Sequence, residues 1–188
     1  MENTKKLLTG LSAADLQDFF LLAPRVFADY RDPDRGPFSI VYSFSQTPDN
    51  EDSNFLKIAD MADEGQMYEV GICKCSLEYG YAGFDHSVER LGACGFNEFS
   101  EIPIVPIHVD GKVNTRTEAN ALVSSITATP SDIGIISPAF HLMRAFVTTV
   151  SAMYQMNLMR PVYAIVGAPL SWTDTVRHSQ GILQNTRA

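Results

Sequence analysis

The chain has 188 residues, and its 14 Lys and Arg residues against 22 Asp and Glu residues give a formal net charge of −8. This length suits one domain, which can bury roughly 70% of its unfolded surface without a disulfide or a metal. A hydrophobic fraction of 45% with 19% charged residues argues against disorder. The acidity argues against nucleic acid or an anionic membrane as a partner, because phosphate surfaces require clustered Lys and Arg.

The same composition predicts a cytoplasmic protein. No run of the sequence approaches the ~20 apolar residues of a membrane span. The apolar run 19–24 follows acidic residues rather than a basic leader, so it predicts a helix face and not a signal peptide. An odd number of cysteines cannot all pair within one chain, which argues against a disulfide framework. The cysteines are Cys73, Cys75 and Cys94.

The first 35 residues predict a helical extension to the domain. Ser12 suits an N-cap, and apolar residues follow it at helical spacing. These residues are Leu16, Phe19, Phe20, Ala23 and Phe27. A segment rich in Pro, Asp and Gly at 31–37 predicts a loop. We therefore divide the chain into an extension at 1–35 and a domain at 36–188.

From residue 38 onward, strand-like segments alternate with helix-like segments. Strands are expected at 38–44, 67–73, 102–109, 132–137 and 161–166, the third being short or irregular because two prolines interrupt it. Helices are expected at 51–62, 84–94, 115–127 and 139–157, and a further helix at 173–183. Alternation of this kind indicates a parallel sheet with right-handed crossovers. The predicted fold is a Rossmann-like three-layer α/β domain with five strands in the order 3-2-1-4-5 and helices on both faces.

Ligands of such sheets bind beyond the carboxyl ends of the strands, at the switch point between the first and fourth strands. Ser137 ends the fourth predicted strand, and His141 and Arg144 share one face of the first turns of the next helix. An imidazole, a guanidinium and a helix N-terminus together favour an anion site. The structural alternative is that Arg144 pairs with a local carboxylate and that His141 is a half-buried packing residue.

A second polar segment begins the predicted helix at 115–127. Thr115 and Glu118 have the spacing of a capping box, in which each side chain accepts a hydrogen bond from the backbone of the helix start. The capping box leaves Asn114 and Arg116 without a structural role. We expect a ligand to contact Asn114, Thr115 or Arg116.

The loops after the first two strands are less informative. Ser43, Ser45 and Gln46 offer hydroxyls and an amide, but the loop has no glycine, and neither G-x-G-x-x-G nor a Walker A motif occurs in the chain. Cys73-x-Cys75 lacks the paired C-x-x-C spacing of structural zinc, and no positioned base accompanies either thiol. Ordinary reduced cysteines are the default interpretation, and His86 is interpreted as a surface or core residue.

A strand ending in Ser, followed by x-x-Phe-His-x-x-Arg-Ala and preceded by an Asn-Thr helix start, resembles the YdcF/SanA-like family (domain of unknown function 218). The matching residues are Ser137, Phe140, His141, Arg144 and Ala145, with Asn114, Thr115 and Glu118. The resemblance spans roughly 38–166 and implies a Rossmann-like fold with a polar pocket lined by these two segments. Family members usually carry glycine-rich turns after the first two strands, where this chain has 43–45 and 73–75, and Glu118 falls one residue late.

Two functional hypotheses follow. The first is a protein that binds a small anionic or nucleotide-like ligand (phosphate, a nucleotide or an S-adenosylmethionine-like molecule). The ligand would lie between 43–46, 114–118 and 137–144, where Ser43, Ser45, Gln46 and Glu118 are expected to contact it together with the residues named above. An enzyme of this kind would be a transferase or hydrolase with His141 as general acid or base, Arg116 or Arg144 stabilising charge and Thr115 positioning the ligand. The alternative is a non-enzymatic interaction module with a degenerate pocket, whose N-terminal helix docks or makes a homo-oligomer.

Overall fold

The computed structural model describes residues 36–75, 81–97, 101–126, 132–158, 160–171, 176–177 and 183–184. Five strands form an all-parallel sheet, and its order β3-β2-β1-β4-β5 confirms the predicted topology. The strands are β1 (Ile40–Ser43), β2 (Val70–Lys74), β3 (Ile104–His108), β4 (Ile133–Ser137) and β5 (Val162–Val166).

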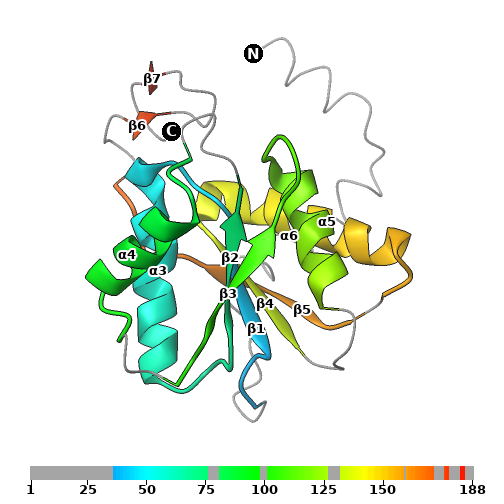
Figure 1. Ribbon diagram of the computed structural model, residues 1–188, viewed down its shortest axis with the longest axis horizontal. Coiled ribbons are helices and arrows are strands. Elements are labelled where there is room, and N and C mark those ends of the chain that lie inside the picture. The colour runs from blue at the N-terminus through cyan, green and yellow to red at the C-terminus, as the bar shows by residue number, and fades with distance from the viewer. Residues whose placement is uncertain are drawn as a thin grey trace, which may run out of the picture.

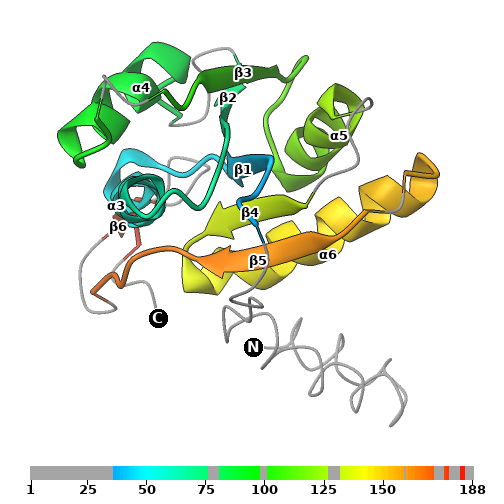
Figure 2. The ribbon, with the colours of Figure 1, turned by 90° about the horizontal axis from the view of Figure 1, so that it is seen from below.

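Helices cover both faces of this sheet, as Figures 1 and 2 show, so the expected three-layer Rossmann-like arrangement is confirmed. They are α3 (Pro48–Asp63), α4 (Phe84–Ala93), α5 (Thr115–Ser125) and α6 (Ala139–Gln155). The first two lie on one face, and α5 and α6 lie on the other. Each helix connects two parallel strands, so the loops that follow the strands gather at one edge of the sheet.

The central strands are apolar along their whole length because both of their faces are covered. In β1, Ile40 and Tyr42 point to the cluster under α5 and α6, while Val41 points to the cluster under α3 and α4. All three side chains are almost fully buried. The sheet is therefore held by two apolar cores, one on each face, and β1 contributes to both.

The prolines of the third strand are accommodated by its position. Pro106 lies within β3, which is an edge strand of the sheet. An edge strand pairs on one side only, so the missing N–H of a proline can face away from the neighbouring strand. The expectation of a short or irregular strand is therefore wrong, since β3 is as long as β2 and pairs with it from Ile104 to His108.

Two predictions outside the sheet fare differently. The helix expected at 173–183 is wrong where the structure describes that segment: β6 (Val176–Arg177) pairs antiparallel with β7 (Leu183–Gln184). Gly181 lies between them and weakens a helix by about 1 kcal/mol relative to Ala. The helical extension predicted at 1–35 lies outside the described residues.

Among the helices described, none is long and apolar enough to cross a membrane.

Candidate functional site

His141 lies at the centre of a polar cluster at the carboxyl edge of the sheet. Its Nδ1 atom is 2.7 Å from Nε2 of Gln46, and its Nε2 atom is 3.0 Å from the hydroxyl of Thr115. Gln46 also donates to the hydroxyl of Ser137 at 3.3 Å. Thus the loop after β1, the start of α5, the end of β4 and the start of α6 meet at one imidazole, at the switch point that the sequence predicts.

The neighbours of Gln46 fix the tautomer of this imidazole. The Gln46 amide nitrogen lies 3.4 Å from the backbone carbonyl of Phe44, which can only accept a hydrogen bond. The same nitrogen therefore donates to Nδ1 of His141, and the ring proton is on Nε2, from which it is donated to Thr115. Because the Thr115 hydroxyl accepts the hydrogen bond from His141, its own proton is not used in this contact and can be donated to a ligand.

His141 is neutral at neutral pH. Burial, with a smaller effect from the positive charge of Arg144, lowers the pKa of His141 to about 4. The imidazole therefore positions Gln46 and Thr115 and adds no positive charge to the site.

The capping box expected from Thr115 and Glu118 is wrong. The N-cap is Asn114, one residue before the predicted Thr115, and the third helical residue is Thr117. The Asn114 side chain accepts hydrogen bonds from the backbone N–H groups of Arg116 and Thr117, and the Thr117 hydroxyl accepts one from the backbone N–H of Asn114. Glu118 lies one position beyond the residue that closes a capping box. The side chain of Asn114 is thus occupied by the helix start rather than directed at a ligand.

Glu118 instead points into the core, where it is 1% exposed. One of its carboxylate oxygens accepts from the Tyr42 hydroxyl at 2.9 Å and from the backbone N–H of Ser45 at 2.8 Å. Burial raises the pKa of Glu118 to about 7, and the hydrogen bonds from Ser45 and Tyr42 limit the rise. This carboxyl group anchors the glycine-free loop after β1 to the helix on the other side of the site.

The two arginines of the predicted site are exposed. Within the part of the chain that the structure describes, neither Arg116 nor Arg144 forms an ion pair. The N-terminus of α6 has no side-chain cap and no acidic residue in its first turn. The positive end of this helix dipole and the guanidinium of Arg144 therefore favour an anion at this place.

A narrow recess adjoins the His141 cluster, between the carboxyl ends of β1 and β2 and the start of α4. Its interior is small, about 20 Å³, and the space reaches about 380 Å³ only when the open solvent at its mouth is counted. Ser43, Ser45 and Gln46, all predicted site residues, lie in its wall. Ser43 ends β1, and its hydroxyl accepts from the buried amide of Asn54 at 3.1 Å. The remaining lining residues are Phe44, Glu51, Phe55, Ile72, Cys73, Cys75, Tyr81, Ala82, Gly83 and Ser87.

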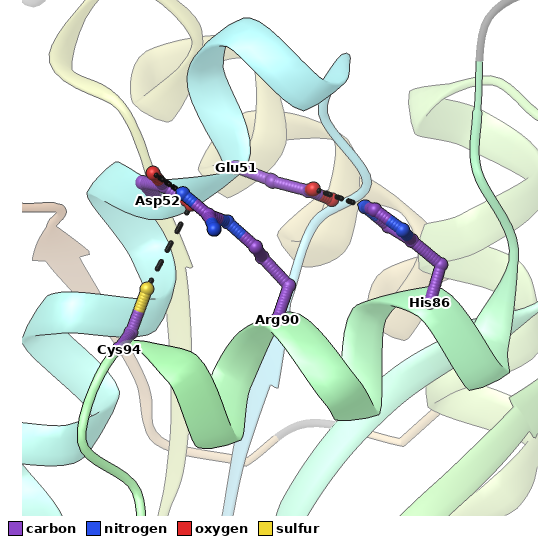
Figure 3. A network of polar contacts seen from close by, with 5 residues as sticks. All are labelled: Glu51, Asp52, His86, Arg90 and Cys94. Carbon is purple, nitrogen blue, oxygen red and sulfur yellow. Dashed lines mark hydrogen bonds and ion pairs between the residues drawn. The ribbon is translucent and has the colours of Figure 1, made fainter.

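Sequence reasoning missed the carboxylate of this recess. Glu51 is 4% exposed and lies 2.7 Å from Nε2 of His86, on the neighbouring helix (Figure 3). Burial raises the pKa of Glu51, and the hydrogen bond to His86 opposes the rise. The two residues are 35 positions apart and form no local motif, so only the packing of α3 against α4 reveals the pair.

The three cysteines are free thiols. Burial raises the pKa of each of them, most strongly that of Cys73, so the unreactive thiol form predominates at neutral pH. Among the described residues, no group of three or more His, Cys, Asp or Glu side chains is arranged to hold a metal ion.

Fold and site together define a Rossmann-like α/β protein with a polar cluster at the switch point of its sheet. In comparisons with known proteins, no family model, no curated protein and no solved structure matches this chain.

Proposed function

We propose that this is a cytoplasmic YdcF-like protein that binds a small phosphate-bearing or nucleotide-like ligand at the carboxyl edge of its sheet. The ligand class includes phosphate, a nucleotide and S-adenosylmethionine. The observation that carries the proposal is the His141 cluster, which joins four chain segments at the switch point beside an uncapped helix N-terminus. Buried polar clusters at this position of a doubly wound sheet are typical of ligand sites.

Charge supports an anionic group on the ligand. The α6 start carries backbone N–H groups, the positive end of the helix dipole and Arg144 one turn further on, with no acidic residue in the first turn. Thr115 offers a hydroxyl donor, and Arg116 is exposed beside it. A phosphate needs only a few such donors, so an acidic protein can bind one.

An enzymatic role would be group transfer or hydrolysis at the bound phosphate or activated group. His141 would act as a base only after Gln46 releases Nδ1, because Nε2 already carries the ring proton. Its lowered pKa keeps it unprotonated at neutral pH, which favours a base over an acid. Arg144 and Arg116 would stabilise developing negative charge.

The proposal predicts binding of a small anionic or nucleotide-like ligand that depends on Arg144 and Thr115. We expect inorganic phosphate, AMP or S-adenosylmethionine to give a calorimetric binding signal with the full chain. Arg144→Gln should weaken that binding about 5- to 10-fold because it removes a charge-assisted contact, and Thr115→Val should do the same by removing a donor.

A matched control is Arg160→Gln. Arg160 directly precedes Pro161 and β5, so it lies at the opposite edge of the sheet. Its loss changes the net charge by the same amount as Arg144→Gln and should alter phosphate affinity less than about twofold. If both arginine variants lose the same affinity for phosphate, the effect comes from the net charge of the protein and not from a contact with Arg144. Absence of binding by all three compounds would remove the proposed function.

One surface favours the alternative, an interaction module. Phe140, Val147 and Tyr154 are 48%, 49% and 77% exposed, and their spacing of seven residues places them on one stripe of α6. Apolar stripes of this kind are used by helices that meet partner helices. This surface would support a homo-oligomer.

The interaction alternative predicts a dimer that depends on this stripe. Light scattering after size exclusion should then give twice the monomer mass for the full chain and the monomer mass for Val147→Glu, because a buried unpaired carboxylate opposes the contact. Gln155→Glu is the control, because this exposed position on the same helix lies about 100° around the helix axis from Tyr154 and introduces the same charge. A monomeric wild-type chain would exclude the homo-oligomer.

A further inference from the structure

The recess between β1 and β2 differs chemically from the helix start at which an anion would bind. Its wall contains the carboxylate of Glu51 and the hydroxyls of Ser45 and Ser87, over an apolar floor that includes Phe55 and Ile72. Among the described residues that line the recess there is no Lys or Arg. An anionic group would be repelled here, whereas a neutral group that donates hydrogen bonds would be accepted.

Glu51 is held ready for such a role by its partner on α4. His86 Nε2 lies 2.7 Å from one carboxylate oxygen, with 41% of the His86 side chain exposed and 6% of the Glu51 side chain exposed. Because the contact engages one of the two oxygens, the carboxylate keeps acceptor capacity for a ligand in the recess. The histidine is therefore a positioning residue, and Glu51 is the group that would touch a ligand.

A second ion pair joins the same two helices but faces away from the recess. Arg90 makes two hydrogen bonds to Asp52, at 2.7 and 2.6 Å, and the Cys94 thiol lies 3.7 Å from the same carboxylate (Figure 3). Neither Asp52 nor Arg90 lines the recess. Both pairs link α4 to α3, but only the Glu51–His86 pair presents a carboxylate to the recess.

Carboxylates and serine hydroxyls over aromatic and aliphatic surface are the groups that recognise sugar hydroxyls; a carboxylate on ribose hydroxyls is the familiar case in nucleotide-binding folds. Gln46 links the two regions, since it lines the recess and also bonds to His141. A single ligand could therefore present its phosphate to α6 and its hydroxyl-bearing part to Glu51.

We infer that the open mouth of the recess is a sugar subsite, in which Glu51, positioned by His86, accepts hydrogen bonds from hydroxyls that a sugar phosphate inserts into the recess. The inference rests on the proposed phosphate site and narrows its ligand to phosphates that carry a polyhydroxyl group. It also assigns Ser87, which follows His86 on α4, to the same subsite.

The test compares three phosphates by calorimetry on the full chain: ribose 5-phosphate, methyl phosphate without hydroxyls, and 2-aminoethyl phosphate with an ammonium group. We expect ribose 5-phosphate to bind at least about tenfold more tightly than methyl phosphate, because hydrogen bonds to a charged acceptor discriminate by at least this factor. Glu51→Gln, which keeps an acceptor for His86, should reduce this preference to about threefold or less. Ser87→Ala should reduce it in part.

Asp52→Asn is the matched control, since it removes the neighbouring carboxylate between the same helices and should leave the preference unchanged. Equal losses in Asp52→Asn and Glu51→Gln would show a merely structural role and overturn the subsite. A preference for 2-aminoethyl phosphate would replace the sugar with a cationic group and also overturn it. Equal binding of ribose 5-phosphate and methyl phosphate ends the sugar inference but keeps the phosphate site, whereas no binding of any of the three ends both. If Glu51→Gln does not fold, the Ser87→Ala result decides.

Discussion

Replacing Glu118 by Gln and His141 by Gln should change the pH dependence of stability in opposite directions. The folded-state pKa of Glu118 is raised from 4.5 to about 7, so the folded state holds the proton more tightly than the unfolded state. The contribution of Glu118 to the free energy of unfolding is therefore at its maximum below pH 4.5 and is lost as the pH rises towards 7. The folded-state pKa of His141 is lowered from 6.5 to about 4, so stability from this group is full above pH 6.5 and is lost as the pH falls towards 4.

The two contributions nearly cancel in the wild-type protein because their pH windows overlap. Relative to wild type, Glu118→Gln should gain stability as the pH rises from 4.5 to 7, since the cost of ionising Glu118 is gone. His141→Gln should gain stability as the pH falls from 6.5 to 4. Each relative change should be on the order of 2–3 kcal/mol across its window.

Urea unfolding at half-unit steps from pH 4 to pH 7.5 measures both slopes. The double variant should return close to the wild-type pH dependence, apart from a constant offset. Curves for both single variants that run parallel to the wild-type curve would mean that neither group titrates differently in the folded and unfolded states.

Gly167→Ala should destabilise the protein by about 2–3 kcal/mol, because an added methyl group would meet backbone rather than a movable side chain. A Cβ atom at Gly167 would lie 2.9 Å from the carbonyl oxygen of Ser53 and 3.0 Å from its carbonyl carbon. Ser53 cannot withdraw, because it lies within α3 and its backbone oxygen and hydroxyl both bond to Ala168 at 2.6 Å.

Gly92→Ala is the matched control for this substitution. Gly92 lies in α4, and a Cβ atom there would meet nothing within 4 Å. This change should stabilise the protein by about 0.5–1 kcal/mol, since Ala favours a helix over Gly. Chemical unfolding of both variants measures the difference, and a Gly167→Ala protein as stable as wild type would show that α3 and the end of β5 can separate.

The fold was predictable because its signals are repetitive. Five apolar segments separated by helix-length segments indicate a parallel sheet whatever the individual residues are, and the crossover rule then limits the strand order. The switch-point rule also points to Ser137 and His141 from the sequence alone. Boundaries differ by a few residues: the first strand was expected at 38–44 and spans Ile40–Ser43.

The site was less predictable because its side chains are placed by tertiary contacts. The Thr115–Glu118 spacing matches a capping box, but Asn114 and Thr117 form the real one, and Glu118 turns inward to Tyr42, 76 positions away. A local pattern cannot distinguish these outcomes, since both begin a helix with polar residues. His86 was assigned no role for the same reason: its partner lies on another helix.

The strand order has a consequence for folding during synthesis. The strand β1 lies at the centre of the sheet and has two neighbours. It pairs with β2, where Val41 lies opposite Val70, and with β4, where Ile40 lies opposite Ile133. Its second neighbour therefore leaves the ribosome some ninety residues after β1 itself, at a separation of 133 − 40 = 93 positions. Until then one side of the strand has unpaired backbone groups that attract other chains. His141 follows β4, so the candidate site is among the last parts of the domain to assemble, and a nascent chain released early would expose β1 before it could bind any ligand.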